Sequence, residues 1–207
     1  LPLATVLATD FSEEMVAKAE ALAEGTPNMA ACFLDAQDMA AIADESQDVV
    51  VCCYGYMFPE DKVEALRETR RVLKAGGTLV ATTWDRVDIL SISRDVMTAV
   101  LGKPPPPPPM NPMSLSEPGL FKSLLVEAGF DEGEIKQTTS TYPFDLGDDK
   151  KFQFKVGTIL LKDSIEELDA WEVAEEAFWK NIGKYARMEG GSMTLPDNTF
   201  RMTVVTK

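Results

Sequence analysis

The sequence contains no histidine, and this absence narrows its chemistry before any motif is considered. Without an imidazole it offers no Ser-His-Asp triad, no histidine metal ligand and no histidine general base. Its three cysteines, Cys32, Cys52 and Cys53, lack the spacing of a metal site. We interpret them as reduced, small core residues rather than as a catalytic thiol.

Basic residues and long apolar runs are also scarce. The chain has 20 Lys and Arg against 34 Asp and Glu, a formal net charge of −14. That charge repels phosphate backbones and anionic lipid surfaces, so we expect no nucleic-acid partner. The longest apolar run, residues 49–58, falls short of the roughly 20 residues that a bilayer-spanning helix needs. The start lacks the basic residues of a signal peptide, and we expect a cytoplasmic protein.

What remains is the composition of an ordinary globular protein. The 207 residues are 45% apolar and 26% charged. This length is typical of one domain with a small appendage, and it supplies enough apolar material for a core. The oligomeric state is left open.

Strands and helices alternate over the first 83 residues. We expect strands at residues 6–9, 29–34, 49–53 and 78–83, with helices beginning at Glu13 and spanning residues 61–73. Residues 49–53 are apolar at every position, as in a parallel strand that is covered on both faces. The pattern predicts an α/β fold with an open, doubly wound, mostly parallel sheet and helices on both faces.

The second half is less regular. We expect helices at residues 88–101 and 116–128 and strands at residues 135–144 and 199–206, while residues 152–161 are ambiguous. Six consecutive prolines, residues 104–109, predict a polyproline II spacer. Ser164 and Glu167 form a capping box that predicts a long helix as far as Tyr185.

Ligands bind beyond the carboxyl ends of the strands in an open α/β sheet. An acid there can accept hydrogen bonds from both hydroxyls of a ribose, although such acids more often cap a helix or sit in a turn. The residues at these strand ends are Asp10, Asp35, Cys53, Tyr54, Trp84 and Asp85.

Five segments, in order and spacing, resemble class I S-adenosylmethionine-dependent methyltransferases. TDFSEEM (residues 9–15), LDAQDM (34–39) and QDVVVCCYGYMF (47–58) look like the second, third and fourth strands of that family with the loops after them. LRETRRVLKAGG (66–77) resembles the helix and turn before the fifth strand, with Ala75 where proline is usual, and LLVEAGF (124–130) the helix before the sixth. The nearest type is small-molecule, as in ubiquinone and menaquinone biosynthesis.

The resemblance implies S-adenosylmethionine as cofactor and assigns it a binding site. Asp10 would hold the ribose hydroxyls, and Phe11 and Met15 would flank the adenine. Asp35 would accept from the adenine amino group, and the backbone of Ala36 would meet a ring nitrogen. From the residues alone, Met15 is equally compatible with plain core packing, since it falls on an apolar helix face.

The remaining assignments concern the reacting end of the cofactor and the acceptor. Gln37 belongs to the same cofactor-binding loop, and Cys53 and Tyr54 would border the sulfonium and its methyl group, although Tyr54 could simply roof the cleft. Methyl transfer by in-line displacement needs positioning and desolvation more than a base; Tyr54 and Asp85 are the candidates if a base is used. The small-molecule acceptor would be apolar or aromatic and would contact Met57, Phe58 and Trp84. No metal ligand set is apparent.

One family feature is missing from the sequence. The glycine-rich cofactor loop should precede Asp10, and no such loop is present. We therefore expect a truncated or fragmentary chain without the first strand and helix, comprising a cofactor-binding half (1–87), a helical and proline-rich lid (88–115) and a C-terminal half with a helical cap (116–207). The alternatives are an inactive methyltransferase-fold binding module and, less compatible because no G-x-G-x-x-G is present, a nicotinamide dehydrogenase.

Overall fold

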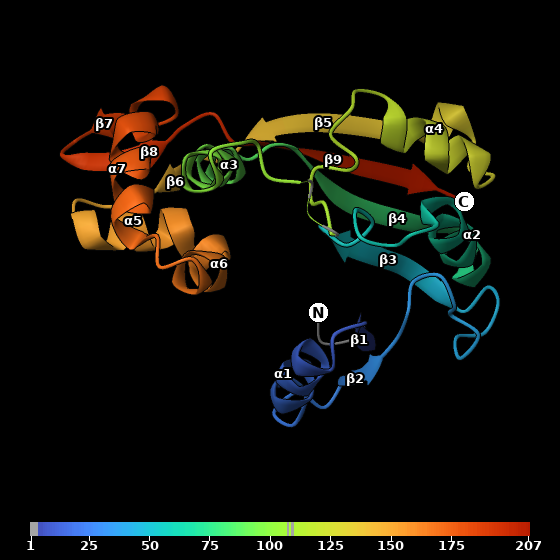
Figure 1. Cartoon of the computed structure of the whole chain (residues 1–207). Coiled ribbons are helices and arrows are strands. Elements are labelled where there is room, and N and C mark those ends of the chain that lie inside the picture. Colours follow the sequence, from blue (N-terminus) through green and yellow to red (C-terminus); the bar gives the residue numbers. More distant parts are fainter. Residues whose placement is uncertain (1–3, 107, 109) are drawn as a thin grey trace. The chain divides into compact units, whose positions relative to one another are not determined.

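A computed structural model describes residues 4–106, 108 and 110–207 (Figure 1). The chain divides into two compact units. Unit 1 comprises Leu1–Ala81, Gly119–Lys136 and Thr203–Lys207, and unit 2 comprises Thr82–Pro118 and Gln137–Met202. The predicted polyproline spacer falls partly on Pro107 and Pro109, which lie outside the described residues.

Unit 1 begins with a strand–helix–strand motif. Strands β1 (Val6–Asp10) and β2 (Met29–Phe33) pair in parallel, and helix α1 (Glu13–Ala23) connects them and packs against both. The Ser12 hydroxyl caps α1 by accepting from the Met15 N–H at 3.4 Å, which satisfies one of the free donors of the first turn. These three elements agree with the sequence-based prediction.

A second sheet has the strand order β3-β4-β9-β5. Its members are β3 (Gln47–Cys53), β4 (Leu73–Arg86), β9 (Thr199–Thr206) and β5 (Lys136–Thr141). Helix α2 (Lys62–Val72) buries Ala65, Leu66, Thr69 and Val72, and it contacts helix α4 (Leu120–Glu127), beyond which lies the short 3-10 helix η1 (Glu132–Glu134). The expectation that β3 is covered on both faces is wrong for the described residues, because Val49 and Val51 are 54% and 64% exposed.

Unit 2 contains a helical cluster with its own core. It comprises α3 (Asp88–Leu101), α5 (Lys150–Thr158), η2 (Ile159–Leu161), α6 (Lys162–Glu167), α7 (Trp171–Asn181) and η3 (Ile182–Lys184). Helix α3 packs against α7, and Ile92, Val96 and Phe178 lie fully buried in this core. A small antiparallel sheet, β6 (Phe144–Asp145), β8 (Ser192–Leu195) and β7 (Arg187–Glu189), accompanies the helices.

Several predictions for the second half need correction. The helix expected from Ser164 to Tyr185 is broken, because Asp169 adopts a left-handed backbone (φ 48°) between α6 and α7. Ser164 lies inside α6 instead of capping it. Residues 116–119 are not helical, and Gly119, at φ 84°, precedes the first residue of α4.

The sheets differ from the predicted arrangement as well. The class is α/β, as expected, and the described strands form three sheets, of two, four and three strands, whereas the sequence predicts one sheet that lacks its first strand. Among the described residues, no helix has both the length and the apolar character required to cross a bilayer.

Candidate functional site

Two carboxylates lie at the carboxyl ends of β1 and β2. The strands pair in register from Val6 opposite Met29 to Asp10 opposite Phe33, and the Leu34 N–H donates to the Asp10 carbonyl at 3.0 Å. Asp10 and Asp35 therefore end adjacent parallel strands at the same edge. The Asp10 carboxylate is half-buried and accepts from the Ser12 N–H at 2.9 Å, whereas Asp35 is exposed.

Two apolar side chains near this edge are exposed to solvent. Phe11 and Met15 are 52% and 44% exposed, whereas Val16 is the buried residue of α1. Core packing of Met15, which the sequence left open, does not occur in the described structure. Two acceptor groups beside an open apolar surface suit a ligand that carries hydroxyl and amino donors on a flat ring system.

The loop after β2 is tied to the start of α2. One oxygen of Asp35 accepts from the Gln37 N–H at 2.8 Å and from the Gln37 side-chain amide at 3.4 Å. The side-chain oxygen Oε1 of Gln37 in turn accepts from the N–H of Asp61, the N-cap of α2, at 2.7 Å. Ala36 lies half-buried between Asp35 and Gln37. The three predicted loop residues are thus held in one compact turn.

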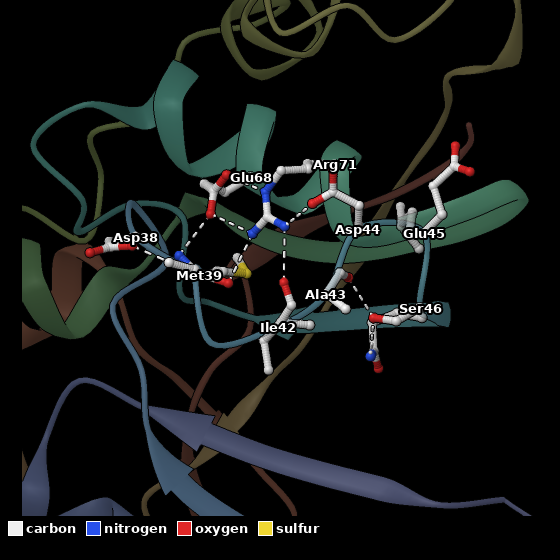
Figure 2. Close-up of polar contacts among 12 residues, drawn as sticks. Asp38, Met39, Ile42, Ala43, Asp44, Glu45, Ser46, Glu68 and Arg71 are labelled. Atoms are coloured by element: carbon white, nitrogen blue, oxygen red, sulfur yellow. Dashed lines mark hydrogen bonds and ion pairs between the residues drawn. The ribbon is translucent and has the colours of Figure 1, made fainter.

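The same loop is anchored a second time through Arg71 of α2 (Figure 2). Its guanidinium donates to the carbonyls of Met39 at 2.8 Å and Ile42 at 2.9 Å, and it pairs with Glu68 at 2.6 Å and with Asp44. The hydrogen bond from Arg71 lowers the pKa of Glu68, and Glu68 and then Asp44 raise the pKa of Arg71. The helical spacing of Glu68 and Arg71 lets them pair with each other, but it does not show that they also bind this loop.

At the end of β3, Cys53 is exposed and Tyr54 adopts a left-handed backbone with φ 55°. Burial raises the pKa of the neighbouring Cys52 thiol to about 11, the backbone N–H groups of Gly55 and Tyr56 oppose the shift, and the charges of Cys53 and Asp10 add to it. The charge of Asp10 therefore acts electrostatically at the end of β3. A Cβ on Gly55 would lie 2.6 Å from the Cys52 sulfur, so a larger residue at this position would force the Cys52 side chain to move.

The residues after this turn run into the core of unit 1. The Tyr56 hydroxyl is hydrogen-bonded to Thr69 of α2 at 2.6 Å, and burial raises the pKa of Tyr56. Met57 is 2% exposed, and Phe58 is half-buried. Phe58 is therefore the more accessible of the two apolar residues that the sequence assigns to acceptor binding.

Trp84 and Asp85, the last two predicted site residues, belong to unit 2. The Trp84 ring meets the Phe200 ring edge-on, with centroids 6.4 Å apart. Asp85 forms an ion pair with Arg201 at 2.8 Å, and the Thr139 hydroxyl lies 3.4 Å from its second oxygen. The Asp85 carboxylate is thus engaged by the Arg201 guanidinium. In the part of the chain that the structure describes, no three Cys, Asp or Glu side chains cluster as metal ligands.

Comparison with solved structures shows the fold. BH2331 from Bacillus halodurans C-125 superposes with a TM-score of 0.58 at 18% identity, over 97% of this chain and 82% of its own. The cyclase SpnF gives a TM-score of 0.55 at 19% identity, over 99% of this chain and 67% of its own. These likenesses establish a shared α/β architecture over nearly the whole chain.

Sequence comparison adds a likeness to methyltransferases in the first part of the chain. The family pattern described as "Methyltransferase domain" matches residues 1–81. The methyltransferase tpcH of Aspergillus fumigatus is 36% identical over 96 residues, which are 45% of this chain and 34% of tpcH. The chain thus matches about a third of the length of this curated relative. The sequence is thus similar to a methyltransferase domain over residues 1–81, and the curated relative that it resembles over 96 residues is described as a methyltransferase.

Proposed function

We propose that this protein transfers a methyl group from S-adenosylmethionine to a small, apolar or aromatic acceptor. The observation that carries the proposal is the placement of Asp10 and Asp35 at the ends of adjacent parallel strands, beside the exposed side chains of Phe11 and Met15. Two carboxylates can accept from ribose hydroxyls and from an adenine amino group, and an open apolar surface suits the purine ring.

The proposed binding roles follow from this placement. Asp10 accepts from both ribose hydroxyls, and Asp35 accepts from the adenine amino group. The Ala36 backbone meets a ring nitrogen, and Phe11 and Met15 flank the ring faces. Both carboxylates already have one contact with a local N–H, from Ser12 in one case and from Gln37 in the other, and these contacts fix their orientation.

The proposed chemistry is an in-line displacement. The cofactor supplies a methyl group that is activated by a positively charged sulfur. Cys53 and Tyr54 border that group, and they position it and exclude water from it. Tyr54 is the candidate base for an acceptor that must lose a proton; Asp85 is less suited, because it is paired with Arg201.

The acceptor class and the domain roles extend this proposal. Phe58, Met57 and Trp84 are apolar residues that favour a hydrophobic or aromatic acceptor. Residues 1–87 form the cofactor-binding half, 88–115 the lid, and 116–207 the second half with its helical cap. We also propose a Rossmann-like, doubly wound arrangement for the domain, which the parallel β1–β2 pair with its connecting helix α1 supports.

The rival is a methyltransferase-fold protein that binds ligands without catalysis. The likeness to SpnF, which is described as a cyclase, shows that this architecture is not confined to methyl transfer. Cofactor binding separates the two better than a search for the acceptor, because the acceptor is not identified.

Titration calorimetry with S-adenosylhomocysteine tests the proposal. The 207-residue chain and the full product of its gene are both titrated, and NAD⁺ is the control ligand. We expect saturable binding of S-adenosylhomocysteine by the full gene product and none of NAD⁺. If neither form binds S-adenosylhomocysteine, the proposal fails and the non-catalytic alternative stands.

A further inference from the structure

The segment between β2 and β3, residues 34–46, has little structure of its own. Apart from a single antiparallel bridge between Asp35 and Asp38, its internal hydrogen bonds are short-range ones, such as that from the Ile42 N–H to the Met39 carbonyl at 2.8 Å. A loop of this kind would sample several conformations, at an entropic cost of about 1–2 kcal/mol per residue that becomes fixed. Contacts outside the loop must therefore hold Asp35 in one place.

Helix α2 supplies these contacts. The central contact engages both the N–H and the carbonyl group of Met39. The Met39 N–H donates to Glu68 Oε2 at 2.8 Å, and the Met39 carbonyl accepts from Arg71 Nη2 at 2.8 Å. Glu68 and Arg71 are bonded to each other at 2.6 and 2.8 Å, so one ion pair clamps residue 39 from both sides (Figure 2). The Met39 side chain is 8% exposed, which fixes the same residue by packing.

The same guanidinium holds two further points of the loop. Nη1 of Arg71 donates to the Ile42 carbonyl at 2.9 Å and bonds to Asp44. A planar fork of five donors is needed for this set, and a lysine ammonium cannot reproduce it because it is a point charge. The Arg71 and Glu68 side chains are 28% and 16% exposed, so these charge-assisted hydrogen bonds are partly shielded from water.

The clamp lies close to the predicted adenine contact. Met39 follows Asp35 by four residues, and the intervening Gln37 is bonded to the N-cap of α2 at Asp61. The loop is therefore bonded to helix α2 at two places, at Gln37 and at residues 39–44. That helix therefore sets the position of the Asp35 carboxylate together with the end of β2, where the Leu34 N–H donates to the Asp10 carbonyl.

We propose that Arg71, acting with Glu68, is a positioning residue for cofactor recognition, which holds the loop so that Asp35 meets the adenine amino group. Arg71 itself touches no cofactor. The inference rests on the proposed function, since it presumes that Asp35 reads adenine.

If Arg71 only stabilised the fold, its substitution would weaken the binding of all ligands by the same factor. If Arg71 positions Asp35, its substitution would remove the preference for a ligand that carries the 6-amino group of adenine. The measurement is the ratio of two dissociation constants, one for S-adenosylhomocysteine and one for the analogue that lacks only the 6-amino group of adenine. We expect the wild type to prefer the amino compound by about tenfold, because a charged hydrogen bond is lost in the analogue. The Arg71→Lys variant should show a preference below about threefold.

Two variants complete the experiment. Arg67→Lys is the matched control, because Arg67 lies on the same helix, is exposed and pairs only loosely with Glu64 at 3.4 Å; it should keep the wild-type ratio. Asp35→Ala should abolish the preference outright. Thermal unfolding of each variant reports whether it folds.

The outcomes are distinct. A folded Arg71→Lys protein with the wild-type preference overturns the inference while leaving the proposed function intact. An Asp35→Ala protein with the wild-type preference removes the adenine assignment and the inference with it. No binding of S-adenosylhomocysteine by the wild type in either length overturns the proposed function itself.

Discussion

Each carboxylate of the candidate site uses one oxygen to hold its own backbone. Asp10 accepts from the Ser12 N–H, and Asp35 accepts from the Gln37 N–H. These contacts fit the alternative in which an acid after a strand only stabilises a turn or caps a helix. They do not exclude ligand binding, because a carboxylate has about four acceptor positions. Residue-scale tests should therefore keep the local contact and remove only the charge.

Asp10→Asn meets that condition. The amide oxygen can still accept from the Ser12 N–H, so the turn and the start of α1 should persist. The second oxygen becomes an NH₂ group that donates instead of accepting, and a ribose hydroxyl loses its partner. We expect the affinity for S-adenosylhomocysteine to fall by about 10- to 100-fold, with little change in thermal stability. Titration calorimetry measures this affinity, in whichever of the two forms of the protein binds S-adenosylhomocysteine.

Asp48→Asn serves as the control, since Asp48 is an exposed carboxylate near the start of β3 that pairs with Lys74 at 2.8 Å. It should bind S-adenosylhomocysteine as the wild type does. Equal affinity in the two variants would refute the assignment of Asp10 to the ribose.

The adjacent thiols of Cys52 and Cys53 should differ sharply in reactivity. Burial raises the pKa of Cys52 from 9.0 to about 11, so at pH 8 about one Cys52 thiol in a thousand is a thiolate, whereas Cys53 is exposed. We expect iodoacetamide at pH 8 to label Cys53 in the folded protein and to leave Cys52 unmodified. Peptide mass mapping follows both sites.

The sign of the pH effect provides the check. Because the folded-state pKa of Cys52 is raised, its labelling rate in a Cys53→Ser variant should climb until the pH approaches about 11 and then level off. A rate that is already maximal near pH 9 would show that the thiol is not desolvated in the folded protein.

At the scale of elements, regular apolar spacing was enough to predict most helices and strands. The helix at Asp88–Leu101 and the strand at Thr199–Thr206 have the predicted bounds. The misses occur where a backbone conformation decides the outcome. Asp169 breaks a continuous apolar stripe, and the β7–β8 hairpin turns at Gly190 and Gly191, both with positive φ. A glycine pair between two short strands is the signal that could have predicted this hairpin.

The packing of α5 on α7 permits one test at this scale. A Cβ on Gly157 would lie 2.2 Å from a ring carbon of Phe178, whose side chain is fully buried and packed against Phe154 and Trp179. The ring has no room to retreat, so Gly157→Ala should destabilise the protein by about 1–3 kcal/mol. Denaturant unfolding of the full chain measures this.

Gly183→Ala is the matched control for this substitution. Gly183 lies in η3, its φ is not positive, and a Cβ there would meet nothing within 4 Å. We expect a stability equal to or slightly above that of the wild type, because alanine restricts the unfolded chain. A Gly157→Ala protein as stable as the Gly183→Ala protein would show that the Phe178 ring yields to the added methyl group and that the expected clash does not occur.

At the scale of the whole molecule, the spacing of apolar and charged residues along the sequence predicts little, because it does not show which distant residues come into contact. The contacts that hold the candidate site join residues far apart in the sequence, such as Arg71 with Met39 and Arg201 with Asp85. Helical spacing indicates that Glu68 and Arg71 can pair with each other. It does not indicate that both also bond to Met39, which lies 29 and 32 residues earlier in the sequence. The strand order and the division into two units depend on such distant pairings and were only partly predictable.

Net charge is a whole-molecule property that the sequence does determine. The 207-residue chain has a formal charge of −14, and without histidine its side chains offer no group with an ordinary pKa between about 5 and 8. The charge of the 207-residue chain should therefore vary by no more than about two units from pH 6 to pH 8, through the terminal amino group and the edges of the carboxyl and thiol titrations. It should then fall towards zero near pH 4.4, where carboxylates gain protons. Electrophoretic mobility across this range measures the charge. A steep change between pH 6 and pH 8 would contradict the prediction, because it would require a carboxyl or thiol group whose pKa the fold has moved into that interval.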